Sequence, residues 1–73
     1  MLGQLLKKAR LDARLTQEQL ALKSGVDRSY LSEIERNVRN PTLQMVLKLC
    51  RAMNISAVSI VRQLESPVAR KSR

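Results

Sequence analysis

The sequence predicts a compact all-α domain of five short helices. Five stretches repeat apolar residues at intervals of three and four, which places those residues on one face of a helix. No stretch alternates apolar and polar residues as a half-buried β-strand does. With 73 residues the chain is sufficient for one domain, which we expect over residues 1–65. Residues 66–73 are expected to form a basic, disordered tail.

The first helix is expected over residues 2–13, where one apolar stripe contains Leu2, Leu5, Leu6, Ala9 and Ala13. The next helix begins at Thr16, because Thr16 and Gln19 have the spacing of a capping box. It ends before Gly25, which stands where a left-handed residue terminates a helix at little cost.

The third helix begins after Asp27, a residue that favours the N-cap position, and ends near Arg36. The loop over residues 37–41 follows, because Pro41 stops any helix that enters this segment. The last two helices are expected over residues 43–53 and 57–64. Each is preceded by a capping hydroxyl, and a left-handed stop lies between them; these residues are Thr42, Ser56 and Asn54.

The chain is strongly basic, with 14 Lys and Arg against 6 Asp and Glu and a net charge of +8. Such an excess predicts a polyanionic partner, either nucleic acid or an anionic membrane surface. Tyr30 is the one aromatic residue, so a stacking platform for single-stranded nucleic acid is not expected. No apolar run approaches the ~18 residues of a membrane span and no signal peptide is apparent, so we expect a cytoplasmic protein. A basic amphipathic membrane binder is the alternative, but the capped short helices and the polar face of the third helix favour a folded domain without a membrane partner.

The residue types that most often bind metals or perform catalysis are scarce. Histidine is absent and Cys50 is the one cysteine, so we expect no metal site, disulfide or cofactor. No pair of acids stands in a readable cleft, and an enzyme is not expected. Cys50 lies on the inner apolar stripe of its helix and is interpreted as a small buried residue rather than a redox switch.

The second and third helices give the strongest indication of function in the sequence. Two short helices joined by a tight, glycine-bearing turn are typical of the helix-turn-helix unit, which places its second helix in the major groove of DNA. One sector of roughly 140° on the third helix holds polar side chains, since each residue advances about 100° around the axis. These are Arg28, Ser29, Ser32, Glu33 and Arg36. The sector predicts a base-reading surface; the alternative is an ordinary solvated face.

We expect base reading, or a position in the groove, from Arg28, Ser29, Tyr30 and Ser32. Arg28 can donate twice to guanine, whereas Ser29 and Ser32 are small enough for close approach. Tyr30 lies at the edge of the sector, where contact with DNA and packing within the protein are both open. Glu33 accepts from cytosine or pairs with an arginine of the same helix, Arg28 or Arg36, and we favour the pairing.

Helix ends predict the phosphate contacts. Gln17 stands at the start of the second helix, where a side chain and free backbone amides bind a phosphate together. Polar residues also surround the exit of the third helix and are expected to hold phosphates or the rim of the groove: Arg36, Asn37, Arg39 and Asn40. The two asparagines are equally suited to a turn. In the tail, Arg70, Lys71 and Arg73 either add sequence-independent phosphate contacts or are solvated.

Two features predict how the domain is held together. Glu35 leans toward the interior and Arg10 flanks the apolar stripe of the first helix, so we expect an ion pair between them rather than two unrelated surface charges. The last two helices carry more apolar surface than one contact needs, with Leu43, Val46, Leu47, Cys50 and Met53 on an inner stripe. A chain this short buries only about 60% of its unfolded surface, which favours oligomerisation. We predict a two-fold homodimer through Met45, Leu49, Ala52, Val58, Val61 and Leu64; the alternative is a monomer in which the last helix covers both stripes.

The runs TQEQLA and SEIERN resemble the lambda-repressor/Cro-like helix-turn-helix superfamily over about residues 4–64. Within it, DRSYLSEIERNVRNPTL is similar to the controller proteins of restriction–modification systems. The resemblance implies a dimer that binds operators upstream of its own gene and the endonuclease gene, and it implies the bridge from Arg10 to Glu35. Glu33 departs from the small residue often found at its position in controllers.

Other functions stay open at this stage. A phage or plasmid Cro-like repressor shares most of these features, and an antitoxin uses the same fold to bind an enzyme. Antitoxins usually need an added segment, and here only the tail over residues 66–73 is spare. RNA polymerase would be a further partner of an activator, but its contact surface cannot be assigned to Glu18 or Glu33 from the sequence.

Overall fold

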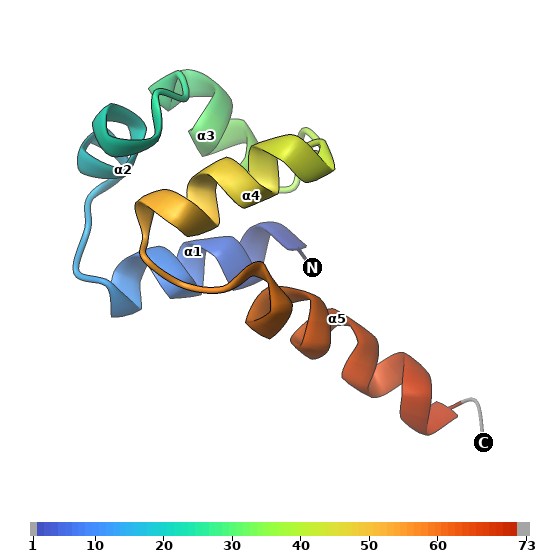
Figure 1. The fold of residues 1–73 in the computed structure, drawn as a ribbon. Helices are drawn as coiled ribbons and strands as arrows, with labels where there is room; N and C mark the ends of the chain where they lie inside the picture. Colours follow the sequence, from blue (N-terminus) through green and yellow to red (C-terminus); the bar gives the residue numbers. More distant parts are fainter. Residues whose placement is uncertain (1, 72–73) are drawn as a thin grey trace.

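The computed structural model describes residues 2–71 and the side chains of residues 2–64. Over this range it contains five helices and no strand: α1 (Leu2–Asp12), α2 (Gln17–Ser24), α3 (Arg28–Glu35), α4 (Leu43–Ala52) and α5 (Ala57–Lys71) (Figure 1). The five-helix, all-α class expected from the sequence is therefore confirmed.

The first four helices form a bundle, and α5 runs away from them on the side opposite α2 and α3 (Figure 1). α2 packs on α3 and α4, α1 packs on α3 and α5, and α4 also packs on α5. The buried apolar core takes residues from every helix and from the turn before α3: Leu6, Leu20, Val26, Leu31, Ile34, Val46, Leu49, Cys50, Met53 and Ile60.

The N-terminal caps expected from the sequence are present. The Thr16 hydroxyl accepts from the Gln19 N–H at 3.0 Å, while the Gln19 side-chain oxygen accepts from the Thr16 N–H at 2.9 Å. Asp27 accepts from the Tyr30 N–H at 3.2 Å in the same way. Two hydroxyls cap the last two helices: Thr42 at α4 and Ser56 at α5. Each satisfies a backbone donor that the first helical turn leaves unpaired.

Left-handed residues end the first four helices. Gly25 has φ 75° after α2, and Asn54 has φ 60° after α4, both as expected. Asn37 ends α3 with φ 62°, and Arg14 ends α1 with the same angle. At each of the three non-glycine residues, its own N–H and the N–H of the next residue donate to carbonyls of the preceding helix. This is the Schellman arrangement. Arg14 has no short polar side chain to favour this conformation, and nothing in the residues around it predicts a left-handed turn there.

Gly3 permits a close contact between α1 and the end of α3. Its N–H donates to the side-chain oxygen of Asn37 at 3.0 Å. A Cβ at this position would collide with the carbonyl oxygen of Ile34 and would lie 2.6 Å from the Asn37 side-chain oxygen. The start of α1 therefore approaches the backbone of α3 as closely as it does because residue 3 has no side chain.

α5 continues past Leu64, where the sequence predicts its end, to Lys71. Residues 65–71 contain no glycine or asparagine that would end a helix in the left-handed conformation, and the helix continues through Pro67, which lacks a backbone N–H donor. Phosphate contacts are expected from Arg70 and Lys71, whose side chains are outside the described part of the structure. Arg73 lies outside the described residues altogether.

Candidate nucleic-acid interface

α3 buries one side and presents the other. Leu31 and Ile34 belong to the core, whereas Arg28 and Ser29 are exposed and Ser32 is partly exposed. The structure thus places the polar sector expected from the sequence on the outside of the domain. Tyr30 is half-buried, and its ring packs against the core cluster from the edge of this sector.

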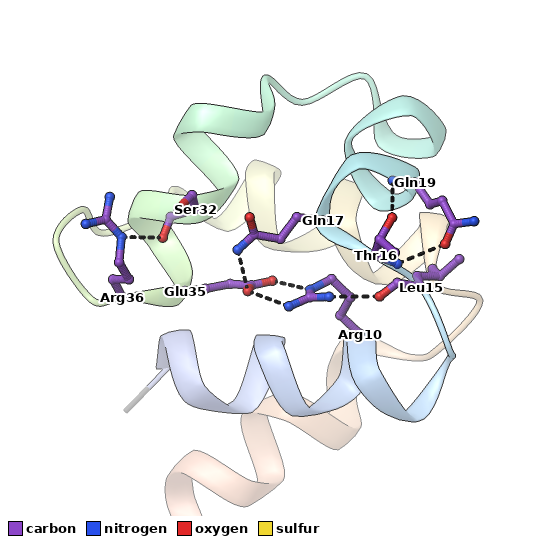
Figure 2. A network of polar contacts seen from close by, with 8 residues as sticks. All are labelled: Arg10, Leu15, Thr16, Gln17, Gln19, Ser32, Glu35 and Arg36. Atoms are coloured by element: carbon purple, nitrogen blue, oxygen red, sulfur yellow. Dashed lines mark hydrogen bonds and ion pairs between the residues drawn. The ribbon is translucent and has the colours of Figure 1, made fainter.

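A buried ion pair anchors the inner side of α3. The Arg10 guanidinium donates to the two carboxylate oxygens of Glu35, from Nε at 2.7 Å and from Nη2 at 3.0 Å (Figure 2). Its Nη1 donates to the Leu15 carbonyl at 2.8 Å. Arg10 is 6% exposed and Glu35 5% exposed, so both charges are removed from water. Such a pair fixes geometry more than it adds net stability, because desolvation offsets most of the attraction.

Gln17 joins this network at the start of α2. Its side-chain nitrogen donates to Glu35 at 3.0 Å, which links α2 to α3 through the same carboxylate that holds α1 (Figure 2). An amide nitrogen carries two N–H donors, and Glu35 takes one of them. The second N–H of the Gln17 side chain can bind a phosphate, together with the free backbone N–H groups in the first turn of α2.

The residues expected at the groove rim divide into two kinds. Arg36 is exposed and turns away from the buried network, with its Nε donating to the Ser32 carbonyl at 3.3 Å (Figure 2). Asn40 is also exposed. Asn37 has a structural task, since it ends α3 in the left-handed conformation and accepts from Gly3. The turn role that was open for Asn37 is thus present.

Glu33 pairs with a different arginine from the two expected. Its carboxylate accepts from Nε of Arg39 at 2.7 Å, rather than from Arg28 or Arg36. The turn at Asn37 brings the chain back along α3, so that the Arg39 N–H also reaches the Glu33 carbonyl oxygen, at 3.3 Å. The hydrogen bond and the negative charge of Glu33 raise the pKa of the Arg39 guanidinium.

The Arg39 guanidinium also lies over the ring of Tyr30, 5.2 Å from its centroid. This distance is within the range of a cation–π contact. Tyr30 therefore contacts the core with one part of its ring and faces an arginine with another, and both of the roles considered for it remain compatible with its position.

The expected dimer surface needs a correction. Leu49 is 0% exposed, so it belongs to the core and cannot contact a second chain. The buried arc of α4 is centred on Val46, Leu49, Cys50 and Met53. Two residues assigned to the inner stripe, Leu43 and Leu47, are exposed instead. The periodicity was right, but it does not show which of two adjacent stripes faces inward.

The other residues of that surface differ in exposure. Met45, Ala52 and Leu64 are partly buried against the core. On α5, Val58 is 59% exposed and Val61 42% exposed. Among the described side chains of α5, over residues 57–64, the two valines are the exposed large apolar ones.

Over the described residues, no group of three or more His, Cys, Asp or Glu is placed to hold a metal ion. None of the helices within residues 2–71 is long and apolar enough to span a bilayer.

Residues 6–60 match a protein-family model described as helix-turn-helix. The chain belongs to this family. Its α2 and α3 are the two helices of the motif, and it is a DNA-binding transcriptional regulator rather than an enzyme. The lambda-repressor-like, five-helix fold expected from the sequence is the fold of its relatives.

Two solved structures illustrate the likeness. The restriction–modification controller protein C.AhdI from Aeromonas hydrophila is 42% identical, with a TM-score of 0.78 over 81% of this chain and 89% of that one. The biofilm master regulator SinR, solved in complex with DNA, is 37% identical with a TM-score of 0.78 over 84% of this chain and 98% of that one.

Among curated proteins, the immunity repressor of Bacillus phage phi105 is 42% identical over 59 residues, or 81% of this chain. The chain spans 41% of that repressor's length. The relatives thus include a restriction–modification controller, a regulator of biofilm formation and a phage immunity repressor.

Proposed function

We propose that this regulator binds a pseudo-palindromic operator as a homodimer and acts as a controller of a restriction–modification system. The observation that carries the proposal is the outward face of α3, where Arg28, Ser29 and Ser32 stand on a helix whose inner side is fixed by the buried Arg10–Glu35 pair. It acts in the compartment that holds the DNA.

The face of α3 suits the major groove. Arg28 lies in the first turn of the helix and is exposed, so its fork of donors can reach O6 and N7 of a guanine. Ser29 and Ser32 leave room for the helix to approach the base edges. Gln17 keeps one side-chain N–H beyond its bond to Glu35, and Arg36 is exposed at the end of α3, which supports their assignment to the phosphate backbone.

The homodimer is supported by α5. Val58 and Val61 expose apolar side chains on one side of a helix that leaves the bundle (Figure 1). A second copy with the same two valines would cover them across a two-fold axis. Such a dimer sets two reading helices about 34 Å apart, or roughly 10 base pairs of B-form DNA, and so requires a site with two-fold symmetry.

The controller role is supported by the likeness to C.AhdI, which is 42% identical and has a TM-score of 0.78 over 81% of this chain. The phage immunity repressor is equally similar in sequence, so a Cro-like repressor is the second candidate.

Selection from a randomised duplex pool, at about 150 mM salt to suppress non-specific binding, tests the proposal. The expected result is one enriched motif with two-fold symmetry and half-sites about 10 base pairs apart. The motif should recur upstream of the regulator's gene and of an adjacent endonuclease gene. Binding without enrichment would overturn the proposal, and co-purification with a neighbouring enzyme would then favour the antitoxin-type function.

A further inference from the structure

Arg39 is held against the middle of the reading helix although it belongs to the loop that follows. Its backbone N–H reaches the Glu33 carbonyl, its Nε reaches the Glu33 carboxylate, and its guanidinium covers the Tyr30 ring. Tyr30 and Glu33 are one turn apart on α3. The positive charge of Arg39 therefore lies beside the surface that enters the groove, rather than on the outer side of the loop.

The contacts leave the most useful donors of Arg39 available. A guanidinium has five N–H donors, and Glu33 takes the one on Nε. Among the described residues, neither terminal amino group has a hydrogen-bond partner. These two groups form the planar two-donor edge that matches O6 and N7 of guanine. The ring of Tyr30 on one side and the carboxylate on the other restrict the direction in which this edge points.

Glu33 places a negative charge on the surface of α3 that is proposed to enter the groove. A carboxylate on a surface that approaches phosphates is repelled by them, and an exposed ion pair of this kind contributes little to stability. Arg39 is 55% exposed at its side chain and Glu33 33% exposed, so the pair is not held together by burial. If the Glu33 carboxylate holds the Arg39 guanidinium in the orientation that reaches a base, the gain in binding offsets the repulsion between the carboxylate and the phosphates.

We infer that Arg39 reads a guanine in the operator and that Glu33 is the residue that positions it. This inference rests on the proposed DNA-binding function and extends it, because it moves Arg39 from the phosphate contacts to the base-reading set. It also predicts that the operator preference of this chain depends on Glu33, although that carboxylate need not touch a base.

The test compares the wild type with Glu33→Gln, Arg39→Ala and the double variant. Each is taken through selection from the randomised pool and then through competition between the enriched operator and single-base variants of it. Arg36→Ala is the matched control, because Arg36 is an exposed arginine at the same end of α3 but has no carboxylate partner among the described side chains. Circular dichroism melting of every variant checks that the fold is retained.

Arg39→Ala should lose about 5- to 150-fold discrimination at one G·C pair per half-site, the amount expected for a lost bidentate contact. Glu33→Gln should lose discrimination at the same pair and keep the wild-type salt dependence, since all arginines remain. The double variant should be no worse than Arg39→Ala. Arg36→Ala should weaken binding to all sequences alike.

Two results would overturn the inference and leave the proposed function standing. In one, Glu33→Gln tightens binding to every sequence equally, which makes the carboxylate merely repulsive. In the other, Arg39→Ala weakens all sequences by the same factor, which makes it a phosphate contact. Failure of the wild type to enrich any motif would instead reject the proposed function, and the inference with it.

Discussion

Removing one partner of the Arg10–Glu35 pair should cost a large part of the stability of the domain. In Glu35→Ala, Arg10 keeps only its bond to the Leu15 carbonyl and loses both carboxylate contacts. It remains 6% exposed unless α1 moves, so its charge is left buried without a counter-ion. Gln17 loses its acceptor at the same time. Breaking a buried pair in this way costs about 3–5 kcal/mol.

That cost is large for a chain of 73 residues, whose total stability is about 4–11 kcal/mol at the usual 0.05–0.15 kcal/mol per residue. Urea unfolding followed by far-UV circular dichroism measures it directly. The double variant Arg10→Met, Glu35→Leu is the control, since replacing both charges by apolar side chains of similar volume is often neutral or stabilising. A loss below about 1 kcal/mol in Glu35→Ala would refute the reasoning, because it would mean that water reaches the orphaned arginine.

Four further outcomes are expected. Gly3→Ala should destabilise by about 1–3 kcal/mol, because the new Cβ meets the Ile34 carbonyl, whereas in an unhindered helix the same change stabilises; urea midpoints decide the sign. Arg14→Gly should stabilise by about 1 kcal/mol, since φ is 62° there, and an unchanged midpoint would show that the turn carries no strain. Burial raises the pKa of the Cys50 thiol, so the folded state holds its proton when the unfolded state has lost it. The contribution of this group to the free energy of unfolding should be fully present well below the unfolded thiol's pKa of about 8.5 and should be lost as the pH rises through and above that value; Cys50→Ala should lack that part of the fall. Val61→Asp should shift a dimer to monomer in sedimentation, while Leu22→Asp, at an exposed position on α2, should leave the mass unchanged.

The sequence predicted what local chemistry determines. A capping hydroxyl or carboxylate acts on a backbone N–H two or three residues away, so Thr16 and Asp27 could be assigned without knowledge of the fold. Gly25 and Asn54 tolerate the left-handed conformation by virtue of their own side chains. The outward face of α3 followed from helical geometry once Leu31 and Ile34 were taken as buried. All of these signals lie within about one helical turn.

The features that the sequence did not predict depend on contacts between distant segments. Gly3 looks like any helical glycine until the carbonyl of Ile34 is placed against it. Leu49 lies on one of two apolar stripes, and only the packing of α4 on α2 and α5 decides which is inside. Glu33 was expected to pair within its own helix, but the turn at Asn37 returns Arg39 to it. A helical wheel cannot show a partner that arrives from a loop.

Both ends of α3 are held by the rest of the domain, and this has a consequence for recognition. Asp27 caps its start, while Glu35 and Asn37 tie its end to α1 through Arg10 and Gly3. Since the helix is already ordered, DNA binding loses little conformational entropy in positioning it. Substitutions among these anchors should therefore lower affinity through the folded fraction and leave base preference unchanged. Substitutions on the outward face should change base preference and leave stability unchanged, so the two groups of residues act through separate terms in the binding free energy.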